Sequence, residues 1–131
     1  MLHETLASYE LALIAKNKGF NRLCAKHYRK GKAKFNYTNN QNPVDFGDIL
    51  FSNSSMPDSF EADCSAPTLA LLQRWTRDVK GVEVYIEHKG NHYSFIITDS
   101  EGYLLHLSCV KYDSYDLALE KGLNCALNNL I

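Results

Sequence analysis

Two histidines and a cysteine lie at the ends of predicted strands in the C-terminal half of the chain. His88 closes one apolar run, His92 opens the next, and Cys109 lies near the end of a third. If the two intervening loops close as symmetric hairpins, the three side chains form one row with neighbours roughly 5 Å apart. Imidazole and thiolate are zinc ligands, but a flat row of three lacks the fourth donor of a closed site. We therefore expect no bound metal, and name His88, His92 and Cys109 as the candidate ligands.

A basic run in the N-terminal third offers a different chemistry. It holds six basic and no acidic residues, whereas the rest of the chain has eight basic and fifteen acidic ones. The six are Arg22, Lys26, Arg29, Lys30, Lys32 and Lys34. Aromatic residues at 28, 35 and 37 accompany them, and cations interleaved with aromatics suit single-stranded nucleic acid. The alternatives are a solvated hairpin whose lysines protect an edge strand, or a contact with the acidic loop that follows.

Patterns for catalysis are absent from the sequence. The serines at 65, 94 and 108 lack a nucleophile elbow, and no nucleotide-binding loop or closed metal motif is present. Asp113 and Asp116 are typical of helix caps, and we expect His106 to pack beside Phe95. The sequence thus predicts a non-enzymatic protein without a cofactor.

Length and composition predict a single domain, residues 1–131, in the cytoplasm. A chain of 131 residues buries roughly two-thirds of its unfolded surface. No apolar run approaches the roughly 18 residues of a membrane span, and the first four residues are acidic where a secretory signal is basic. The four cysteines follow no disulfide framework, so we expect buried, reduced thiols.

Apolar spacing and turn residues predict an α+β fold. Residues 1–38 read as a helix (5–18) ending at Gly19 and a hairpin (24–29 and 32–38) turning at Lys30-Gly31. An irregular acidic loop follows at 39–64, which is either a functional or mobile loop or contains a short element at 48–51. Residues 65–131 read as a helix (66–79), strands (82–88, 92–98 and 103–110) and a helix (114–129) that begins at Asp113. The order α-β-β-α-β-β-β-α predicts an antiparallel sheet of three or more strands with helices packed on one face.

Symmetric hairpins would sort the strand residues into two faces. The predicted core face holds Val82, Val84, Ile86, Ser94, Ile96, Thr98, Tyr103, Leu105 and Leu107. The second face holds Tyr85, Tyr93, Phe95, Ile97, Leu104 and His106, edged by Glu83 and Glu87. This second face is too apolar for solvent, so either residues 1–60 cover it or it binds a partner through Tyr85, Tyr93 and Phe95. The two glutamates disfavour stacking of nucleic-acid bases on these aromatics.

The helix, three strands and helix of residues 65–131 resemble the double-stranded-RNA-binding domain in topology, with Leu71-Leu72 early in the first helix. In that family a lysine cluster opens the last helix and grips phosphates. The matching stretch here, residues 113–116, is acidic and would repel phosphates. We therefore do not expect this chain to share the RNA binding of that family.

Three segments are similar to small uncharacterised proteins from phages and mobile elements of gut Bacteroidales bacteria. They are Ala15-Lys16-Asn17-Lys18-Gly19-Phe20, Ser65-Ala66-Pro67-Thr68 with Leu71-Leu72-Gln73-Arg74-Trp75, and Tyr112-Asp113-Ser114-Tyr115 leading into Ala118-Leu119-Glu120-Lys121-Gly122-Leu123. The resemblance spans nearly the whole chain except the loop 39–63, and implies a phage or mobile-element setting but no mechanism. We predict a protein-interaction module that acts through the Tyr85, Tyr93 and Phe95 face or the loop, with a host or phage protein as partner. The alternative is a nucleic-acid-binding protein that uses the hairpin at 22–34.

Overall fold

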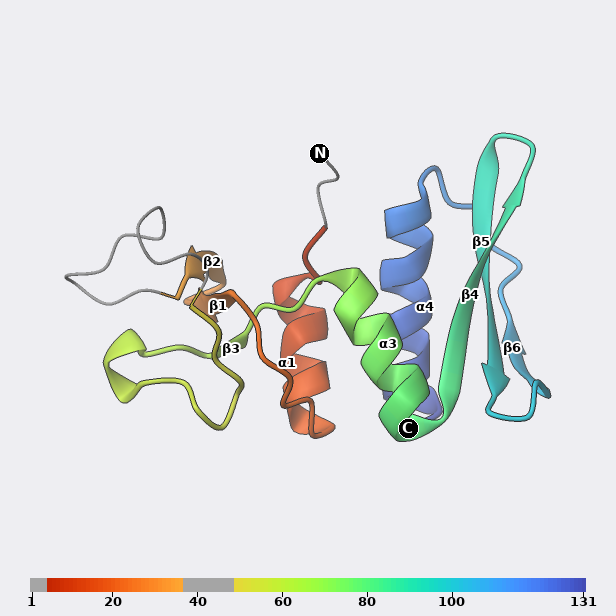
Figure 1. Ribbon diagram of the computed structural model, residues 1–131. Helices are drawn as coiled ribbons and strands as arrows, with labels where there is room; N and C mark the ends of the chain where they lie inside the picture. Colours follow the sequence, from red (N-terminus) through yellow and green to blue (C-terminus); the bar gives the residue numbers. More distant parts are fainter. Residues whose placement is uncertain (1–4, 37–48) are drawn as a thin grey trace. The chain divides into compact units, whose positions relative to one another are not determined.

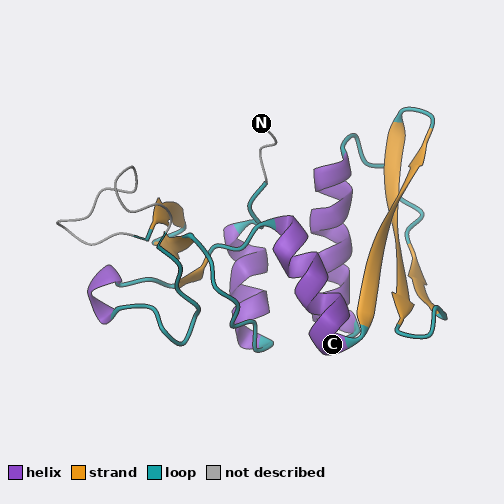
Figure 2. Ribbon diagram, in the orientation of Figure 1, coloured by secondary structure: helices purple, strands orange, loops and turns teal. Residues whose placement is uncertain are grey.

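The computed structural model describes residues 5–36 and 49–131. The chain divides into two compact units: unit 1 comprises Thr5 and residues 68–131, and unit 2 comprises residues 6–67. Each contains a three-stranded antiparallel sheet together with helix (Figures 1 and 2), which confirms the predicted α+β class. The expectation that residues 1–131 form a single domain stays a prediction.

In unit 2, helix α1 (Tyr9–Asn17) begins after Ser8, whose Oγ accepts a hydrogen bond from the Leu11 amide at 3.2 Å. The helix is shorter than predicted because this cap fixes its start at Tyr9 rather than Thr5. Its end follows the prediction: Gly19 has a φ of 96°, and the amide of buried Phe20 donates to the Ala15 carbonyl at 2.9 Å.

The sheet of unit 2 has the order β2-β1-β3 and contains the predicted hairpin. Strands β1 (Lys26–Arg29) and β2 (Lys32–Phe35) join at Lys30-Gly31, where both residues have positive φ as a two-residue type I′ turn requires. Strand β3 (Cys64–Ser65) pairs with β1. Asp63 accepts hydrogen bonds from the Lys30 amide at 2.8 Å and the Tyr9 hydroxyl at 3.1 Å. This carboxylate therefore links the turn to α1.

Residues 39–48 of the predicted irregular loop lie outside the described residues, as do Tyr37 and Thr38 of the predicted hairpin. Within the short element expected at 48–51, Phe51 pairs with Cys24 through backbone hydrogen bonds of 2.9 and 3.0 Å. A short 3-10 helix η1 (Asp58–Phe60) follows, and its buried Phe60 stacks on buried His27 with 4.9 Å between ring centroids. The described part of the loop is thus held to unit 2.

Unit 1 consists of helix α3 (Leu69–Lys80), strands β4 (Val82–Lys89), β5 (His92–Asp99) and β6 (Leu104–Leu107), and helix α4 (Tyr115–Asn129). Thr68 caps α3, and Gly81 with a φ of 68° ends it. Helix α4 is capped by Ser114, which accepts from the Leu117 amide at 3.1 Å. The prediction that Asp113 provides this cap is wrong by one position.

In each unit, a residue before α1 is hydrogen-bonded to a residue just before or at the start of α3. In unit 1, the Leu69 amide donates to the Thr5 carbonyl at 2.9 Å, and the Thr5 hydroxyl donates to the Asp116 carboxylate. In unit 2, the Ala7 amide donates to the Pro67 carbonyl at 2.8 Å. Thr5 is therefore tied into unit 1 although most of that unit lies more than sixty residues along the chain.

The register of β4 with β5 differs by one residue from the prediction. Lys89 pairs with His92, so the turn contains only Gly90-Asn91, with a φ of 62° at Gly90. A slip of one residue moves side chains to the other face. Tyr85 consequently pairs with Ile96, on the face opposite to Val84. The predicted core face, which grouped Val84 with Ile96, is wrong.

Helices α3 and α4 cover the face of the sheet that carries Val84, Phe95 and Ile97, all buried (Figure 2). Helix α4 comes so close that a Cβ added at Gly122 would lie 2.7 Å from Val84 Cγ1 and 3.1 Å from Phe95 Cβ. The Gln73 side chain of α3 donates to the Val84 carbonyl at 2.7 Å. The core of unit 1 lies between these helices and this face.

Candidate functional site

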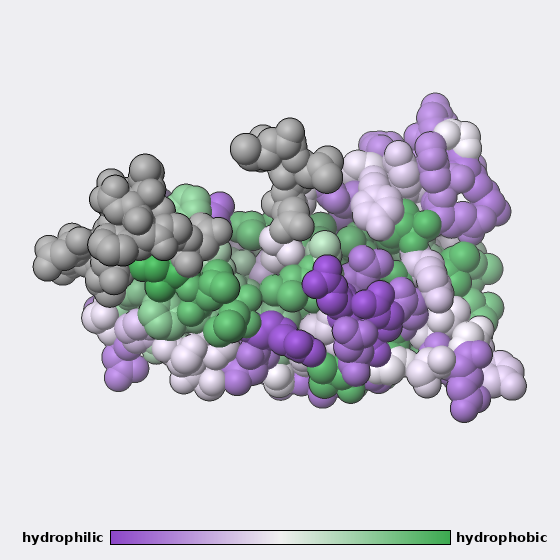
Figure 3. All heavy atoms as spheres, in the orientation of Figure 1, coloured by the Kyte–Doolittle hydropathy of each residue, from purple (hydrophilic) through white to green (hydrophobic). Residues whose placement is uncertain are grey.

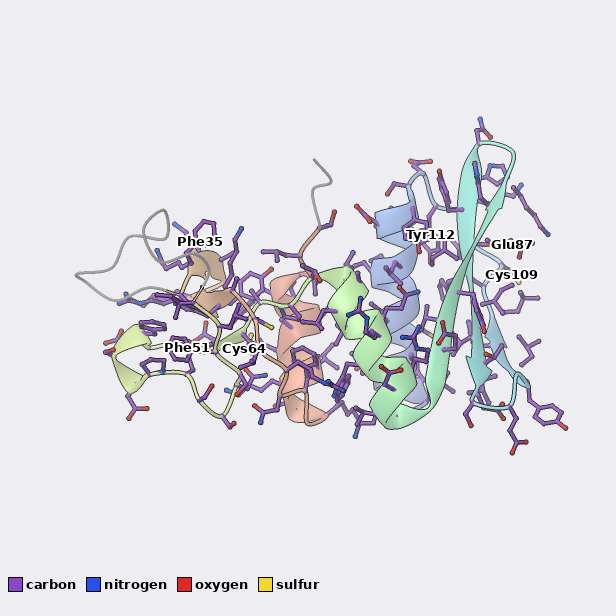
Figure 4. The ribbon with its side chains drawn as sticks, viewed as in Figure 1. Phe35, Phe51, Cys64, Glu87, Cys109 and Tyr112 are labelled. Atoms are coloured by element: carbon purple, nitrogen blue, oxygen red, sulfur yellow. The ribbon has the colours of Figure 1, made fainter. Side chains whose placement is uncertain are left out.

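The side of the sheet away from α3 and α4 is the outer face. Alternation along the strands and the observed pairing place ten residues on it. They are Glu83, Tyr85, Glu87, Lys89, His92, Ser94, Ile96, Thr98, Leu104 and Leu107. Figure 4 shows Glu87 and Cys109 on this side, whereas Tyr112 lies on the side of α4.

An apolar row crosses the middle of the outer face. Tyr85 pairs with Ile96, and Ile96 pairs with Leu107, so one residue from each strand contributes. Tyr85 is 50% exposed, Leu107 53% and Leu104 beside them 60%. Hydrophobic side chains also reach the surface over β6 and the segment that follows it (Figure 3). A contiguous exposed patch of this kind is typical of an interaction surface.

The acidic pocket lies at one end of the outer face, where β4 begins and β5 ends. It has a volume of about 410 Å³ and is lined by Arg77, Gly81, Glu83, Tyr85, Asp99, Ser100, Glu101 and Gly102. Three carboxylates and one guanidinium give it a net negative charge. Tyr85 belongs both to this pocket and to the apolar row, so the two features are continuous.

Glu83 is a largely buried carboxylate of the acidic pocket. Its side chain is only 16% exposed, and its Oε2 accepts no hydrogen bond within the described part of the chain. Burial raises the pKa of Glu83, and the charge of Arg77, with Nε 3.7 Å from Oε2, offsets this only in part. Thr98, the cross-strand neighbour of Glu83, is 9% exposed and its hydroxyl is likewise unpartnered among the described residues. Buried polar atoms nearly always have a hydrogen-bond partner. Glu83 Oε2 and the Thr98 hydroxyl are therefore exceptions within the residues that the structure describes, and a hydrogen-bond donor is missing beside them.

The basic pocket lies at the opposite end of the outer face, where β4 ends and β5 begins. Its volume is about 260 Å³, and it is lined by Lys89, His92, Ser94, Ser108, Cys109, Val110 and Lys111. Lys89 pairs with Glu87 at 2.9 Å, while both lysines are exposed. The outer face is thus negative at one end, apolar in the middle and positive at the other end.

The structure does not bring Tyr85, Tyr93 and Phe95 together as predicted. Tyr85 lies on the outer face, whereas Phe95 is 4% exposed and packs beneath α4. Tyr93 stacks on His88 with 4.4 Å between ring centroids. The prediction that these three side chains share one face is therefore wrong, and the one-residue register error is the reason.

The same error separates the three candidate metal ligands. His92 and Cys109 line the basic pocket, but His88 lies on the opposite face against Tyr93. Within residues 5–36 and 49–131, no group of three or more His, Cys, Asp or Glu side chains is placed to hold a metal ion. His106 stacks on Phe95 with 5.6 Å between centroids, which confirms the predicted packing.

The basic hairpin of unit 2 presents its cations in two directions. Register and alternation place Arg29, Lys32 and Lys34 on one face. On the other face, Lys26 Nζ lies 4.5 Å from the ring centroid of Phe35, which is 48% exposed. Arg29 pairs with Glu61 at 3.0 Å. Of the remaining two cations, Arg22 is exposed and Lys30 lies in the turn.

Sequence reasoning missed Ile96 and Leu107 as surface residues and Glu83 as a pocket residue. The signal that could have given the correct register was Gly90-Asn91, a dipeptide typical of two-residue hairpin turns.

No family model matches the chain, and the searches for similar curated proteins and solved structures find no significant match. None of the described helices has the length and apolar character needed to cross a membrane.

Proposed function

We propose that this protein is a non-enzymatic interaction module that binds a partner protein through the outer face of β4, β5 and β6. The observation that carries the proposal is the row of exposed Tyr85, half-buried Ile96 and exposed Leu107, on a sheet whose other face packs against α3 and α4. An aromatic and aliphatic centre with a charged rim is the usual composition of a protein interface.

The charges at the rim favour a protein over a nucleic acid at this surface. Glu83, Asp99 and Glu101 surround the acidic pocket, and Glu87 lies on the same face. Carboxylates repel the phosphates that dominate nucleic-acid affinity. The resemblance to phage and mobile-element proteins supports a host or phage protein as the partner, in the cytoplasm.

Site-specific photo-crosslinking tests the proposal. A photoreactive phenylalanine derivative replaces Tyr85 in the full chain expressed in Bacteroidales cells, and a matched derivative replaces Arg74, which is exposed on α3. We expect a discrete protein adduct at position 85 and none at position 74. Adding Leu107→Asp should abolish the adduct, while circular dichroism confirms the fold. No adduct at position 85 would contradict the proposal.

A second candidate function is binding of single-stranded nucleic acid by the basic hairpin. The specific observation in its favour is the half-exposed Phe35 ring beneath Lys26 Nζ on one face of the hairpin, while Lys32 and Lys34 are exposed on the other face. An exposed ring beside a cation can stack a base while the cation contacts a phosphate.

Binding of short oligonucleotides at increasing salt tests this second function. The hairpin function requires affinity that falls steeply with salt and is lost when Arg29, Lys30 and Lys32 are changed to Glu. Phe35→Ala should weaken binding without changing the salt dependence. Undetectable binding at low salt would exclude it.

A further inference from the structure

We propose that the outer face is self-complementary and binds a second copy of this chain, face to face about a twofold axis. The inference rests on the proposed function, because it names the partner of the same surface. What supports it is the order of charges along the sheet.

The two charged ends are separated along β4 with the apolar row between them. Glu83 stands near the start of the strand and Lys89 at its end, six residues or about 20 Å apart. A twofold axis that lies between the two faces and runs perpendicular to the strands places each acidic pocket opposite the basic pocket of the other copy. The apolar row of one copy then meets that of the other. A self-complementary patch is what an isologous dimer requires.

The acidic pocket supplies a chemical reason for accepting a lysine. Glu83, Asp99 and Glu101 share a single cationic residue of the pocket lining, Arg77, which already pairs with Asp78 at 3.0 Å. Lys89 or Lys111 of the second copy would bring an ammonium to this excess of carboxylates. It would also bring N–H donors toward the row in which Glu83 Oε2 and the Thr98 hydroxyl have no hydrogen-bond partner among the described residues.

At the basic end, two lysines face a single glutamate of the sheet. Lys89 pairs with Glu87, whereas no ion pair is formed by Lys111 among the described residues. The positive excess is therefore carried mainly by Lys111, an exposed side chain at the rim of the pocket. Its counterpart across the interface is the acidic pocket of the other copy.

The size of the sheet sets the affinity that we expect. Strands β4 and β5 have eight residues each and β6 has four, so the three-stranded sheet has a footprint of at most about 26 Å by 14 Å. This is about half the surface that each partner buries in a standard interface. We therefore expect a weak dimer with a dissociation constant of about 10–100 µM, as for other small interfaces.

Sedimentation equilibrium of the full chain from about 5 µM to 1 mM tests the inference. The mass should rise from 14.9 kDa toward twice that value. Two charge variants provide the specific test. The acidic variant carries Lys89→Glu and Lys111→Glu, and the basic variant carries Glu83→Gln and Glu101→Lys. Each alone should weaken self-association at least tenfold, because like charges then meet at both ends.

An equimolar mixture of the two variants restores opposite charges at both ends, so it should dimerise more tightly than either variant alone. Circular dichroism verifies that both variants are folded. A wild-type chain that stays monomeric at 1 mM would overturn the inference, as would a dimer unaffected by both variants or a mixture that stays monomeric. The proposed function is judged separately: an adduct at position 85 with a different protein supports it even if the chain is monomeric.

Discussion

Replacing Gly122 by alanine tests how closely α4 approaches the sheet. In an exposed helix interior, Gly→Ala stabilises by about 1 kcal/mol because glycine loses more backbone entropy on folding. At Gly122 the added Cβ would lie 2.7 Å from Val84 Cγ1 and 3.1 Å from Phe95 Cβ. Ordinary carbon contacts are about 3.5–4.0 Å, so α4 must move outward or Val84 must leave its rotamer.

The cost of such overpacking is about 1–3 kcal/mol, and it exceeds the gain in helix propensity. We therefore expect Gly122→Ala to lower the free energy of unfolding by about 1 kcal/mol, and the midpoint temperature by about 4 °C. Urea unfolding followed by circular dichroism measures the change. Lys121→Ala, at the preceding exposed position, is the matched control and should change stability by less than about 0.5 kcal/mol.

A double-mutant cycle with Val84→Ala separates steric overlap from other effects. Val84→Ala removes the Cγ1 atom that the new Cβ would meet, so the double variant should be more stable than the sum of the single changes predicts, by about 1 kcal/mol. Additive effects, or a Gly122→Ala variant more stable than the wild type, would refute the close approach of α4 to β4.

Three further predictions concern polar and thiol groups. Asp63→Ala removes the acceptor of the Lys30 amide and the Tyr9 hydroxyl and should cost about 1–2 kcal/mol, measured by urea unfolding. Burial raises the pKa of Cys24 and Cys64 to about 11, so both thiols are protonated at pH 8. A thiol reagent should therefore modify exposed Cys109 at this pH, whereas Cys24 and Cys64 should react only after urea is added. Mass spectrometry measures which cysteines are modified. Burial also raises the pKa of Glu83, so the folded state binds this proton more tightly than the unfolded state, and stability falls as pH rises through the raised value. Glu83→Gln should therefore raise the midpoint temperature at pH 7 and make little difference at pH 4, in thermal scans of the monomer at low concentration.

The element types could be predicted because each junction carries its own local signal. Gly19 and Gly81 end helices, and Lys30-Gly31 turns a hairpin, because these positions need a positive φ that glycine adopts readily. Such signals depend on a few adjacent residues, so a single sequence contains them. The α+β class followed from their order.

The candidate site could not be predicted in the same way because it depends on register. Treating Lys89 as part of the loop, rather than as the partner of His92, moved every β5 side chain to the wrong face. Alternation could not correct the error, because Ile96 and Ile97 are both apolar and either fits a core. The burial of Glu83 could not be predicted from the sequence either, because it depends on Arg77 from α3 and on the turn after Asp99.

The hydrogen bonds of Thr5 show how the two units follow one another along the chain. The bonds of Thr5 to Leu69 and Asp116 close unit 1 across residues 6–67, while Ala7 and Pro67 close unit 2. Unit 2 is therefore inserted within unit 1 in chain order, and backbone hydrogen bonds between residues sixty or more positions apart fasten its entry and exit. Insertions of this kind are tolerated where the two ends already lie close together. The sheet of unit 1, its two helices and the outer face therefore contain no residue of unit 2.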